Sequence, residues 1–87
     1  MLKVVYTKHF LNQYKKLTPT LKTKTRSAIK IFKKNPKNKS LKAHKLTGRL
    51  ADFYSFSIDY KYRIVFELDK DNNQAILLKV GGHEIYR

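Results

Sequence analysis

The sequence predicts an α+β fold: a strand and a helical hairpin precede a three-stranded antiparallel meander, and the helices pack on one face of the sheet. Between residues 7 and 34, apolar side chains recur at three- and four-residue spacing, which is typical of amphipathic helices. Between residues 54 and 80, apolar stretches with strand-like alternation are separated by turn-forming residues. The 87 residues are expected to form one domain, residues 1–87, with a modest core.

The first half is expected to form a strand and two helices. Residues 2–6 are rich in β-branched and aromatic side chains, as strands are. Thr7 is expected to cap a first helix, and Thr18 with Pro19 to begin a second, which ends at Asn35 and Pro36. The apolar stripes are Phe10, Leu11, Tyr14 and Leu17, and then Leu21, Thr25, Ala28, Ile29 and Phe32. The opposite face of the second helix carries Lys22, Arg26, Lys30, Lys33 and Lys34.

The second half is expected to form a long basic loop, residues 35–49, and then three strands. In residues 54–59, aromatic or apolar side chains alternate with polar ones, which predicts a half-buried strand. Residues 62–68 and 75–80 predict the other two strands, joined by a turn at residues 69–74, and Gly81 and Gly82 end the last one. Within residues 62–68, Arg63 is expected on the face opposite to Ile64 and Phe66.

The charge is distributed very unevenly. Residues 1–51 hold fifteen Lys or Arg and no acidic side chain, whereas residues 52–87 hold five basic and six acidic ones, so the halves carry +15 and −1 and sum to +14. Such a field indicates a polyanionic partner, most often nucleic acid. Charge alone is also compatible with a ribosomal-type or other accessory basic nucleic-acid-binding protein that has no catalytic activity.

Several classes of site are excluded or not expected. The chain has no cysteine, which excludes disulfides, thiolate catalysis and zinc–thiolate sites. Its three histidines are far apart, so no metal site and no cofactor are expected. The opening residues are too poor in apolar side chains for a signal peptide and no stretch approaches a membrane span, so a cytoplasmic protein without a membrane partner is expected.

Three segments of the strand half hold the candidate site residues. His44 lies in a Leu-Lys-Ala-His-Lys-Leu-Thr-Gly segment at the end of the basic loop, and Arg63 lies in a Tyr-Arg-Ile-Val-Phe strand. His83 and Tyr86 follow the glycine pair, in Gly-Gly-His-Glu-Ile-Tyr. In a meander, Arg63 and the segment around His83 would lie at the same end of the sheet, with the loop that carries His44 nearby.

These segments, in this order, resemble the RelE/ParE superfamily of bacterial toxin–antitoxin toxins, and most of all its messenger-RNA-cleaving RelE, YoeB and YafQ types. The likeness covers nearly the whole chain in length and element order, and its specific part is residues 44–86. The resemblance implies a type II toxin that enters the ribosomal decoding site and cuts ribosome-bound mRNA. It also implies an acidic antitoxin that holds the toxin inactive.

The resemblance carries over by position. His44 matches a histidine that the YafQ type has before its Leu-x-Gly, His83 matches its catalytic histidine, and Arg63 matches the strand arginine of YoeB and RelE types. Tyr86 lies close to their terminal aromatic residue. The sequence departs from the pattern at three further positions: Ser57 and Lys61 stand where the YafQ type has a histidine and an aspartate, and Ser40 stands where the YoeB type has a glutamate base. The identity of the general base is therefore open.

The chemistry of RNA cleavage gives these residues roles. A base must take the 2′-hydroxyl proton, cationic groups must stabilise the phosphorane, and an acid must protonate the leaving 5′-oxygen. Histidine suits both proton transfers near neutral pH, so His44 and His83 would be base and acid in either order, and Arg63 the phosphate clamp. Tyr86 would stack on a base or order His83. Lys42, Lys45, Arg49 and Lys61 would position RNA phosphates.

Alternatives stay open at this point. Arg63 could instead pair with Glu67 or Asp59 in the sheet, and the lysines of the second helix could form a solvated or antitoxin-binding face. His9, at the start of the first helix, is left outside the site. A ParE-like toxin that inhibits DNA gyrase without catalysis is the alternative within the same superfamily.

Overall fold

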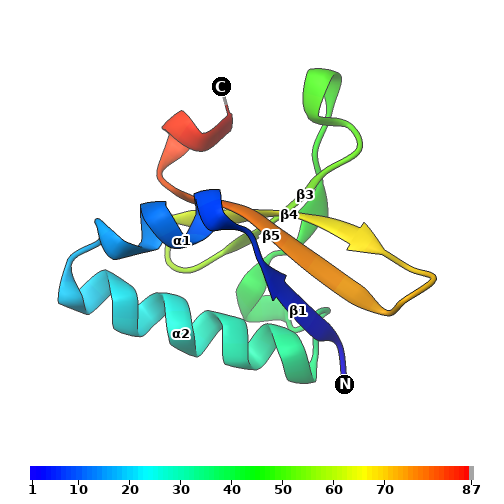
Figure 1. Cartoon of the computed structure of the whole chain (residues 1–87), viewed down its shortest axis with the longest axis horizontal. Coiled ribbons are helices and arrows are strands. Elements are labelled where there is room, and N and C mark those ends of the chain that lie inside the picture. Colours follow the sequence, from blue (N-terminus) through cyan, green and yellow to red (C-terminus); the bar gives the residue numbers. More distant parts are fainter. Residues whose placement is uncertain (87) are drawn as a thin grey trace.

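The computed structural model of the chain describes residues 1–86, which form a five-stranded sheet, two α-helices and three single-turn 3₁₀ helices (Figure 1). The strands are β1 (Lys3–Tyr6), β2 (His44–Lys45), β3 (Tyr54–Ser57), β4 (Arg63–Asp69) and β5 (Gln74–Gly81). The helices are α1 (Lys8–Lys15), α2 (Pro19–Lys34), η1 (Lys39–Leu41), η2 (Gly48–Leu50) and η3 (His83–Tyr86). No helix in the described part of the chain is long and apolar enough to cross a membrane.

The predicted fold class is confirmed. The strand order is β1-β5-β4-β3-β2, in which β1 pairs parallel to β5 and every other neighbouring pair is antiparallel. Both α-helices cover one face of this sheet, whereas η3 and the loop that carries η2 project from the other face (Figure 1). Strands β3, β4 and β5 form the predicted meander.

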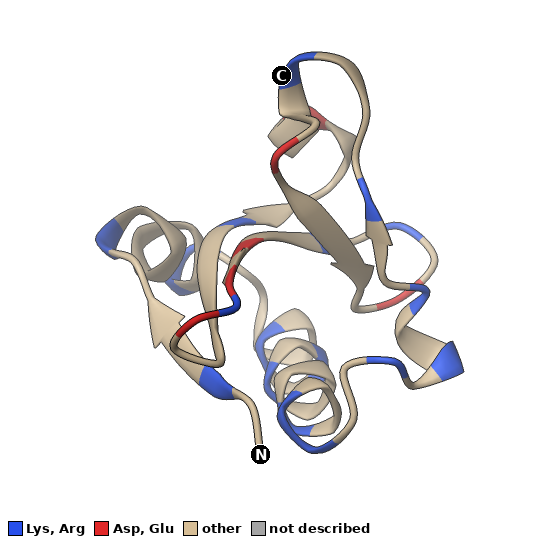
Figure 2. Ribbon diagram, turned by 90° about the vertical axis from the view of Figure 1, so that its right-hand side faces the viewer, with Lys and Arg blue, Asp and Glu red and all other residues tan. Residues whose placement is uncertain are grey.

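The two helices begin where the sequence predicts. The hydroxyl of Thr7 accepts a hydrogen bond from the Phe10 amide (3.1 Å), and that of Thr18 accepts one from the Leu21 amide (3.2 Å), with Pro19 at the first position of α2. Each threonine thus satisfies an amide that the helix itself leaves unpaired. Helix α2 ends before Asn35, as predicted. Figure 2 shows Lys and Arg along α2 and the acidic residues in the strand half.

The prediction that residues 35–49 form a long basic loop is wrong in part. The segment contains the turn η1 and the short strand β2, which extends the sheet by pairing His44 with Ser55 and Lys45 with Tyr54. Pattern analysis misses this strand because it is only two residues long and both of its side chains are exposed. The consequence is functional, since β2 attaches His44 to the sheet.

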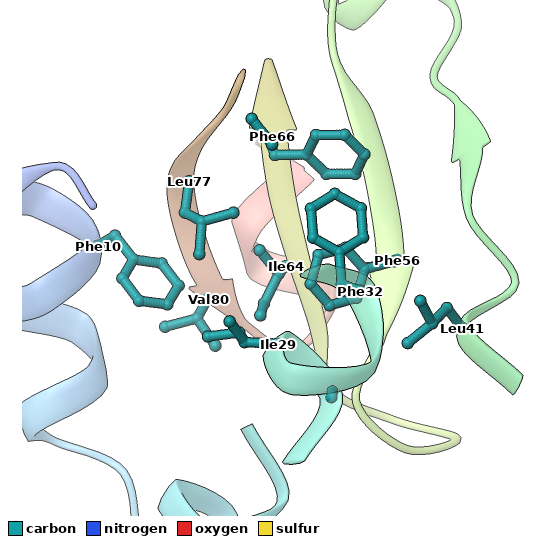
Figure 3. Packing of buried hydrophobic residues seen from close by; sticks show 11 residues of the cluster. Phe10, Ile29, Phe32, Leu41, Phe56, Ile64, Phe66, Leu77 and Val80 are labelled. Carbon is teal, nitrogen blue, oxygen red and sulfur yellow. The ribbon is translucent and has the colours of Figure 1, made fainter. Parts of the chain in front are cut away.

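The core lies between α2 and the sheet and is built around aromatic rings (Figure 3). Phe32 of α2 stacks on Phe56 of β3 with ring centroids 4.4 Å apart, and its edge meets Phe66 of β4 at 4.9 Å. These three side chains are at most 3% exposed. A β-bulge between Val65 and Phe66 shifts the register of β4 against β5.

Replacing Phe32 should therefore remove the centre of the core. We expect Phe32→Ala to lower the free energy of unfolding by about 3–5 kcal/mol, because the change creates a cavity that neighbouring rings cannot fill. Leu11→Ala, at a side chain 42% exposed, is the control and should cost less than about 1 kcal/mol. Urea titration followed by circular dichroism measures both. Equal losses for the two variants would contradict this view of the core.

Candidate active site

A pocket of about 450 Å³ is lined by His44, Leu46, Thr47, Leu50, Arg63, His83 and Tyr86. The lining includes all four side chains to which the sequence analysis gave catalytic roles. They come from β2, β4 and η3, which lie far apart in the sequence. The structure thus brings together two imidazoles, one guanidinium and one phenol around one opening.

The pocket lies on the sheet face that the α-helices leave free. Phe56 and Ile64 point into the core beneath α2, and side chains alternate along each strand, so Ser55, Ser57 and Arg63 point the other way. On this free face η3 rises on one side and the loop with η2 on the other (Figure 1). The α+β architecture therefore separates a core face from a face that is open to a ligand.

His44 is oriented by its own turn. Its Nδ1 donates to the carbonyl oxygen of Lys42 at 3.0 Å, because a carbonyl can only accept. Lys42 has a left-handed backbone (φ 50°), and its carbonyl lies within reach of the ring. In the neutral ring, a proton on Nδ1 leaves Nε2 as the acceptor. His44 is exposed, so this nitrogen is available to take a proton from a ligand.

Arg63 is held by a serine rather than by a carboxylate. Its guanidinium donates to the hydroxyl of Ser57, the residue directly opposite on β3. Neither Glu67 nor Asp59, the two partners considered from the sequence, forms an ion pair with Arg63 within residues 1–86. Since a neutral hydroxyl leaves the guanidinium charge uncompensated, Arg63 can still attract a phosphate.

Asp59 instead organises the turn between β3 and β4. Its carboxylate accepts hydrogen bonds from the backbone amides of Lys61 (2.9 Å) and Tyr62 (2.7 Å) and lies 3.6 Å from the ammonium group of Lys24 on α2. Burial alone would raise the pKa of Asp59, but the Tyr62 and Lys61 amides and the Lys24 charge together lower it. This turn fixes the start of β4 and with it the position of Arg63.

Tyr86 reaches back from η3 to the sheet. Its hydroxyl lies 2.9 Å from that of Ser55, which is fully buried in β3. Its ring lies 6.1 Å from the ring of His83, tilted by 58°. Since Ser55 pairs with His44 across the sheet, the same region of β3 supports both sides of the pocket.

The glycine pair allows η3 to fold back closely. A Cβ on Gly81 would lie 2.7 Å from a methyl carbon of Ile85 and 2.8 Å from Oε1 of Glu84, and one on Gly82 would lie 2.9 Å from Oε2 of Glu84. The sequence pattern predicts only that these glycines end the strand. In the structure they also leave room for the Glu84 carboxylate, which accepts a hydrogen bond from the Gly82 amide at 2.9 Å.

Glu84 stabilises η3 electrostatically. Its own backbone amide and that of Gly82 lower the pKa of its carboxyl below the ordinary value of 4.5; burial opposes this, and the charges of His83 and Lys61 add to it. The ionised carboxylate therefore favours the turn that carries His83 and Tyr86. Glu84 does not line the pocket.

The four predicted phosphate-binding residues lie outside the lining. Lys42, Lys45 and Arg49 are exposed on the segment that contains His44, and Lys61 is exposed in the turn between β3 and β4. Their role as RNA contacts stays a prediction. His9, which the sequence analysis left out, lines a separate apolar pocket of about 310 Å³ with Phe53 and Ile85.

Sequence reasoning missed the buried hydroxyls that hold the site. The alternating pattern predicts that Ser55 and Ser57 lie on the polar side of a half-buried strand, yet they are only 0% and 7% exposed. Their neighbours in sequence gave no signal of this, because the groups that cover the free face of β3 come from β4 and η3. The one signal in the sequence is that two small hydroxyl side chains, Ser55 and Ser57, lie two residues apart on the same face of a strand. The structure shows that they face Tyr86 and Arg63.

The sequence matches no protein-family model and no curated protein. Solved structures match the fold over nearly the whole chain. The YoeB/ParE toxin of Agrobacterium tumefaciens superposes with a TM-score of 0.77 at 20% identity, covering 94% of this chain and 99% of its own. YafQ of E. coli strain BL21(DE3) superposes with a TM-score of 0.78 at 12% identity, covering 99% and 98%. The RelBE2 toxin–antitoxin complex of Mycobacterium tuberculosis gives 0.68 at 20% identity, covering 94% and 98%.

The chain has the RelE-like toxin fold. This confirms the architecture that the resemblance implied. In this chain, the free sheet face with its pocket lies opposite the helical hairpin (Figure 1). Within residues 1–86, no three His, Asp or Glu side chains are grouped so that they could hold a metal ion.

The carboxylate of Glu84 gives a test of how η3 is held. Because the pKa of Glu84 is lowered on folding, the ionised carboxylate contributes stability above pH 4.5, and this contribution is lost as the pH falls through the lowered pKa. We expect Glu84→Gln to melt at a lower temperature than the parent chain at about pH 7. The difference should shrink below pH 4.5 and disappear once the parent carboxyl is protonated.

Glu67→Gln is the matched control, since it removes one negative charge from an exposed position on β4. Thermal melting of the three proteins over a series of pH values gives the comparison. If the Glu84 variant and its parent melt together near neutral pH, the carboxylate does not support η3.

Proposed function

We propose that the protein is the toxin of a type II toxin–antitoxin system and that it cleaves messenger RNA on the ribosome. The observation that carries the proposal is the pocket on the free sheet face, where His44, Arg63, His83 and Tyr86 meet. The fold supports the same conclusion, since it is shared with a YoeB/ParE toxin and with the toxin–antitoxin complex RelBE2.

The geometry suits a cleavage that uses the 2′-hydroxyl as nucleophile. His44 Nε2 takes the proton of the 2′-hydroxyl, whose oxygen attacks the adjacent phosphorus. Arg63 donates to the non-bridging oxygens as negative charge develops on them. Protonated His83 gives its proton to the 5′-oxygen as the P–O bond breaks, so the products are a 2′,3′-cyclic phosphate and a 5′-hydroxyl. Tyr86, tilted against His83, holds that ring or stacks on a base.

The charge of the chain supports RNA as the substrate. Lys42, Lys45 and Arg49 expose their side chains on the segment that borders the pocket. They add to a net charge of +14, which attracts a phosphate backbone at long range and releases counterions on binding. These contacts supply affinity without sequence preference, and the pocket supplies the chemistry.

Expression in bacteria tests the proposal. Growth should stop, and transcripts should be cut within codons that ribosomes occupy. His83→Ala and Arg63→Ala should each lower the cleavage rate by roughly 10²–10⁴-fold and restore growth, because each removes a positioned catalytic group. Primer extension locates the cuts, and a purified translation system gives the rates.

His9→Ala is the control, since it removes an exposed imidazole from α1 outside the pocket and should stay toxic. Unchanged toxicity of the His83→Ala/Arg63→Ala double variant would overturn the proposed site. DNA damage with intact transcripts would indicate a gyrase-directed toxin instead. Salt-sensitive binding with neither toxicity nor cleavage would indicate a non-catalytic nucleic-acid-binding protein.

We expect the antitoxin to bind this protein on the side of the sheet opposite the pocket. A groove of about 360 Å³ runs between β1, α1 and α2 and is lined by Tyr6, Phe10, Leu11, Tyr14, Arg26, Ile29, Lys30 and Lys33. Tyr6 and Leu11 are 40% and 42% exposed, although both are large and apolar. An apolar floor with a basic rim fits an amphipathic acidic helix, which would cover this surface and neutralise charge.

Charge reversal on the rim tests this docking surface. We expect Lys30→Glu/Lys33→Glu to weaken binding to the acidic product of an adjacent gene by roughly tenfold or more, with a reduced dependence on salt. Cleavage by the free variant should be unchanged. Lys70→Glu, in the turn between β4 and β5, is the control with the same change of charge per residue. Calorimetric titration that gives equal affinities for the double variant and its parent would contradict the assignment.

A further inference from the structure

We propose that Ser55 and Ser57 are positioning residues of the active site, and that strand β3 fixes the spacing between the Tyr86 phenol and the Arg63 guanidinium. The inference rests on the proposed RNA cleavage and assigns to it two residues that lie outside the pocket lining. Ser55 acts through Tyr86, and Ser57 acts through Arg63.

The first support is the burial of these hydroxyls. Within residues 1–86, the buried polar side chains are Thr25, Ser55 and Ser57. A buried hydroxyl is unfavourable unless it is hydrogen-bonded, so its partner shows what it contributes. Thr25 donates to the carbonyl of Leu21 one turn earlier in α2 (2.7 Å), a common local use of threonine in helices. Both serines instead contact side chains that line the pocket.

The second support is the geometry of β3. Ser55 and Ser57 are two residues apart on one strand, so their side chains lie on the same face about 6.7 Å apart. Phe56, which lies between them, is 0% exposed and packs in the core against Phe32. This packing prevents β3 from rotating about its own axis. The attachment points of the phenol and the guanidinium are therefore set by the regular rise of a buried strand.

The serines are not placed to react themselves. Ser55 is fully buried, and its hydroxyl is paired with Tyr86, so no phosphate can approach it. The Ser57 hydroxyl accepts from Arg63 and occupies only part of the donor set of that side chain. The remaining guanidinium donors stay available to the pocket. The arrangement fits orientation of neighbouring groups and does not fit nucleophilic attack by serine.

Orientation matters because catalytic side chains act only within narrow limits of position, about 0.5 Å and 10–20°. Tyr86 stands on a single turn of 3₁₀ helix, which has little stability of its own. Arg63 has a long side chain that would sample many rotamers without a partner. One hydroxyl for each thus converts a mobile group into a fixed one.

A double-mutant cycle in a purified translation system tests the inference. Ser55→Ala and Ser57→Ala should each lower kcat by roughly tenfold, the size expected for one lost hydrogen bond, with little change in KM. Ser55→Ala should have no further effect in a Tyr86→Phe background, and Ser57→Ala none in an Arg63→Ala background. Ser55→Thr and Ser57→Thr keep the hydroxyl on a side chain that suits strands and should retain most of the rate.

A readout independent of activity accompanies the rates. Nitrogen-15 NMR should show guanidinium protons of Arg63 that exchange slowly in the parent chain and rapidly in Ser57→Ala. Thr25→Val is the control, because it removes a buried hydroxyl that has no contact with the pocket; it should alter the melting temperature but not the rate.

The outcomes separate the inference from the proposed function. If the serine variants cleave at the parental rate while Arg63→Ala and Tyr86→Phe are impaired, the positioning role is wrong and the cleavage site stands. Ser55→Ala is compared in the parent and in Tyr86→Phe, and Ser57→Ala in the parent and in Arg63→Ala. If each serine substitution lowers the rate by the same factor in its two backgrounds, the serines act through general stability and the inference fails. If Arg63→Ala and Tyr86→Phe also cleave normally, the proposed function and this inference fail together.

Discussion

The stacking of Phe32 on Phe56 is the interaction on which the rest of the structure depends. It fixes α2 against β3 with ring centroids 4.4 Å apart and so decides which face of β3 is core. Because side chains alternate along a strand, Ser55 and Ser57 must then face the opposite side. That side carries the pocket, and the same alternation in β4 directs Arg63 there. Packing in the core thus determines the position of polar groups on the far face.

The uneven charge gives the molecule two different sides. The apolar groove along the helical hairpin has a rim of Arg26, Lys30 and Lys33, and the free sheet face has His44, Arg63 and His83 around a pocket. Concentrated positive charge opposes folding through self-repulsion and is relieved by an acidic partner. The proposed antitoxin at the groove and the proposed RNA at the pocket would both provide this, and the two surfaces lie on opposite sides of the sheet.

The sequence predicted those features that depend on local pattern. The capped helices and the meander follow from residues such as Thr7, Thr18 and Phe56, whose neighbours in sequence define their role. The two-residue strand β2 could not be predicted, because it exists only through its pairing with β3. The roles of Ser55 and Ser57 escaped for a similar reason: their partners, Tyr86 and Arg63, are 31 and 6 residues away. The alternation of polar and apolar residues along a strand does not show which side chains of other elements pack on its faces.

The site is divided between parts of unequal stability. Arg63 belongs to a strand with neighbours on both sides, and β2 holds His44 at the edge of the sheet. His83 and Tyr86 belong to η3, which is held by buried Ile85, by Glu84 against the glycine pair and by the hydrogen bond to Ser55. Opening of η3 would remove two of the four side chains while the sheet stayed folded, at a cost well below that of global unfolding. The pocket therefore combines side chains fixed to the sheet with two side chains on a turn that can open locally.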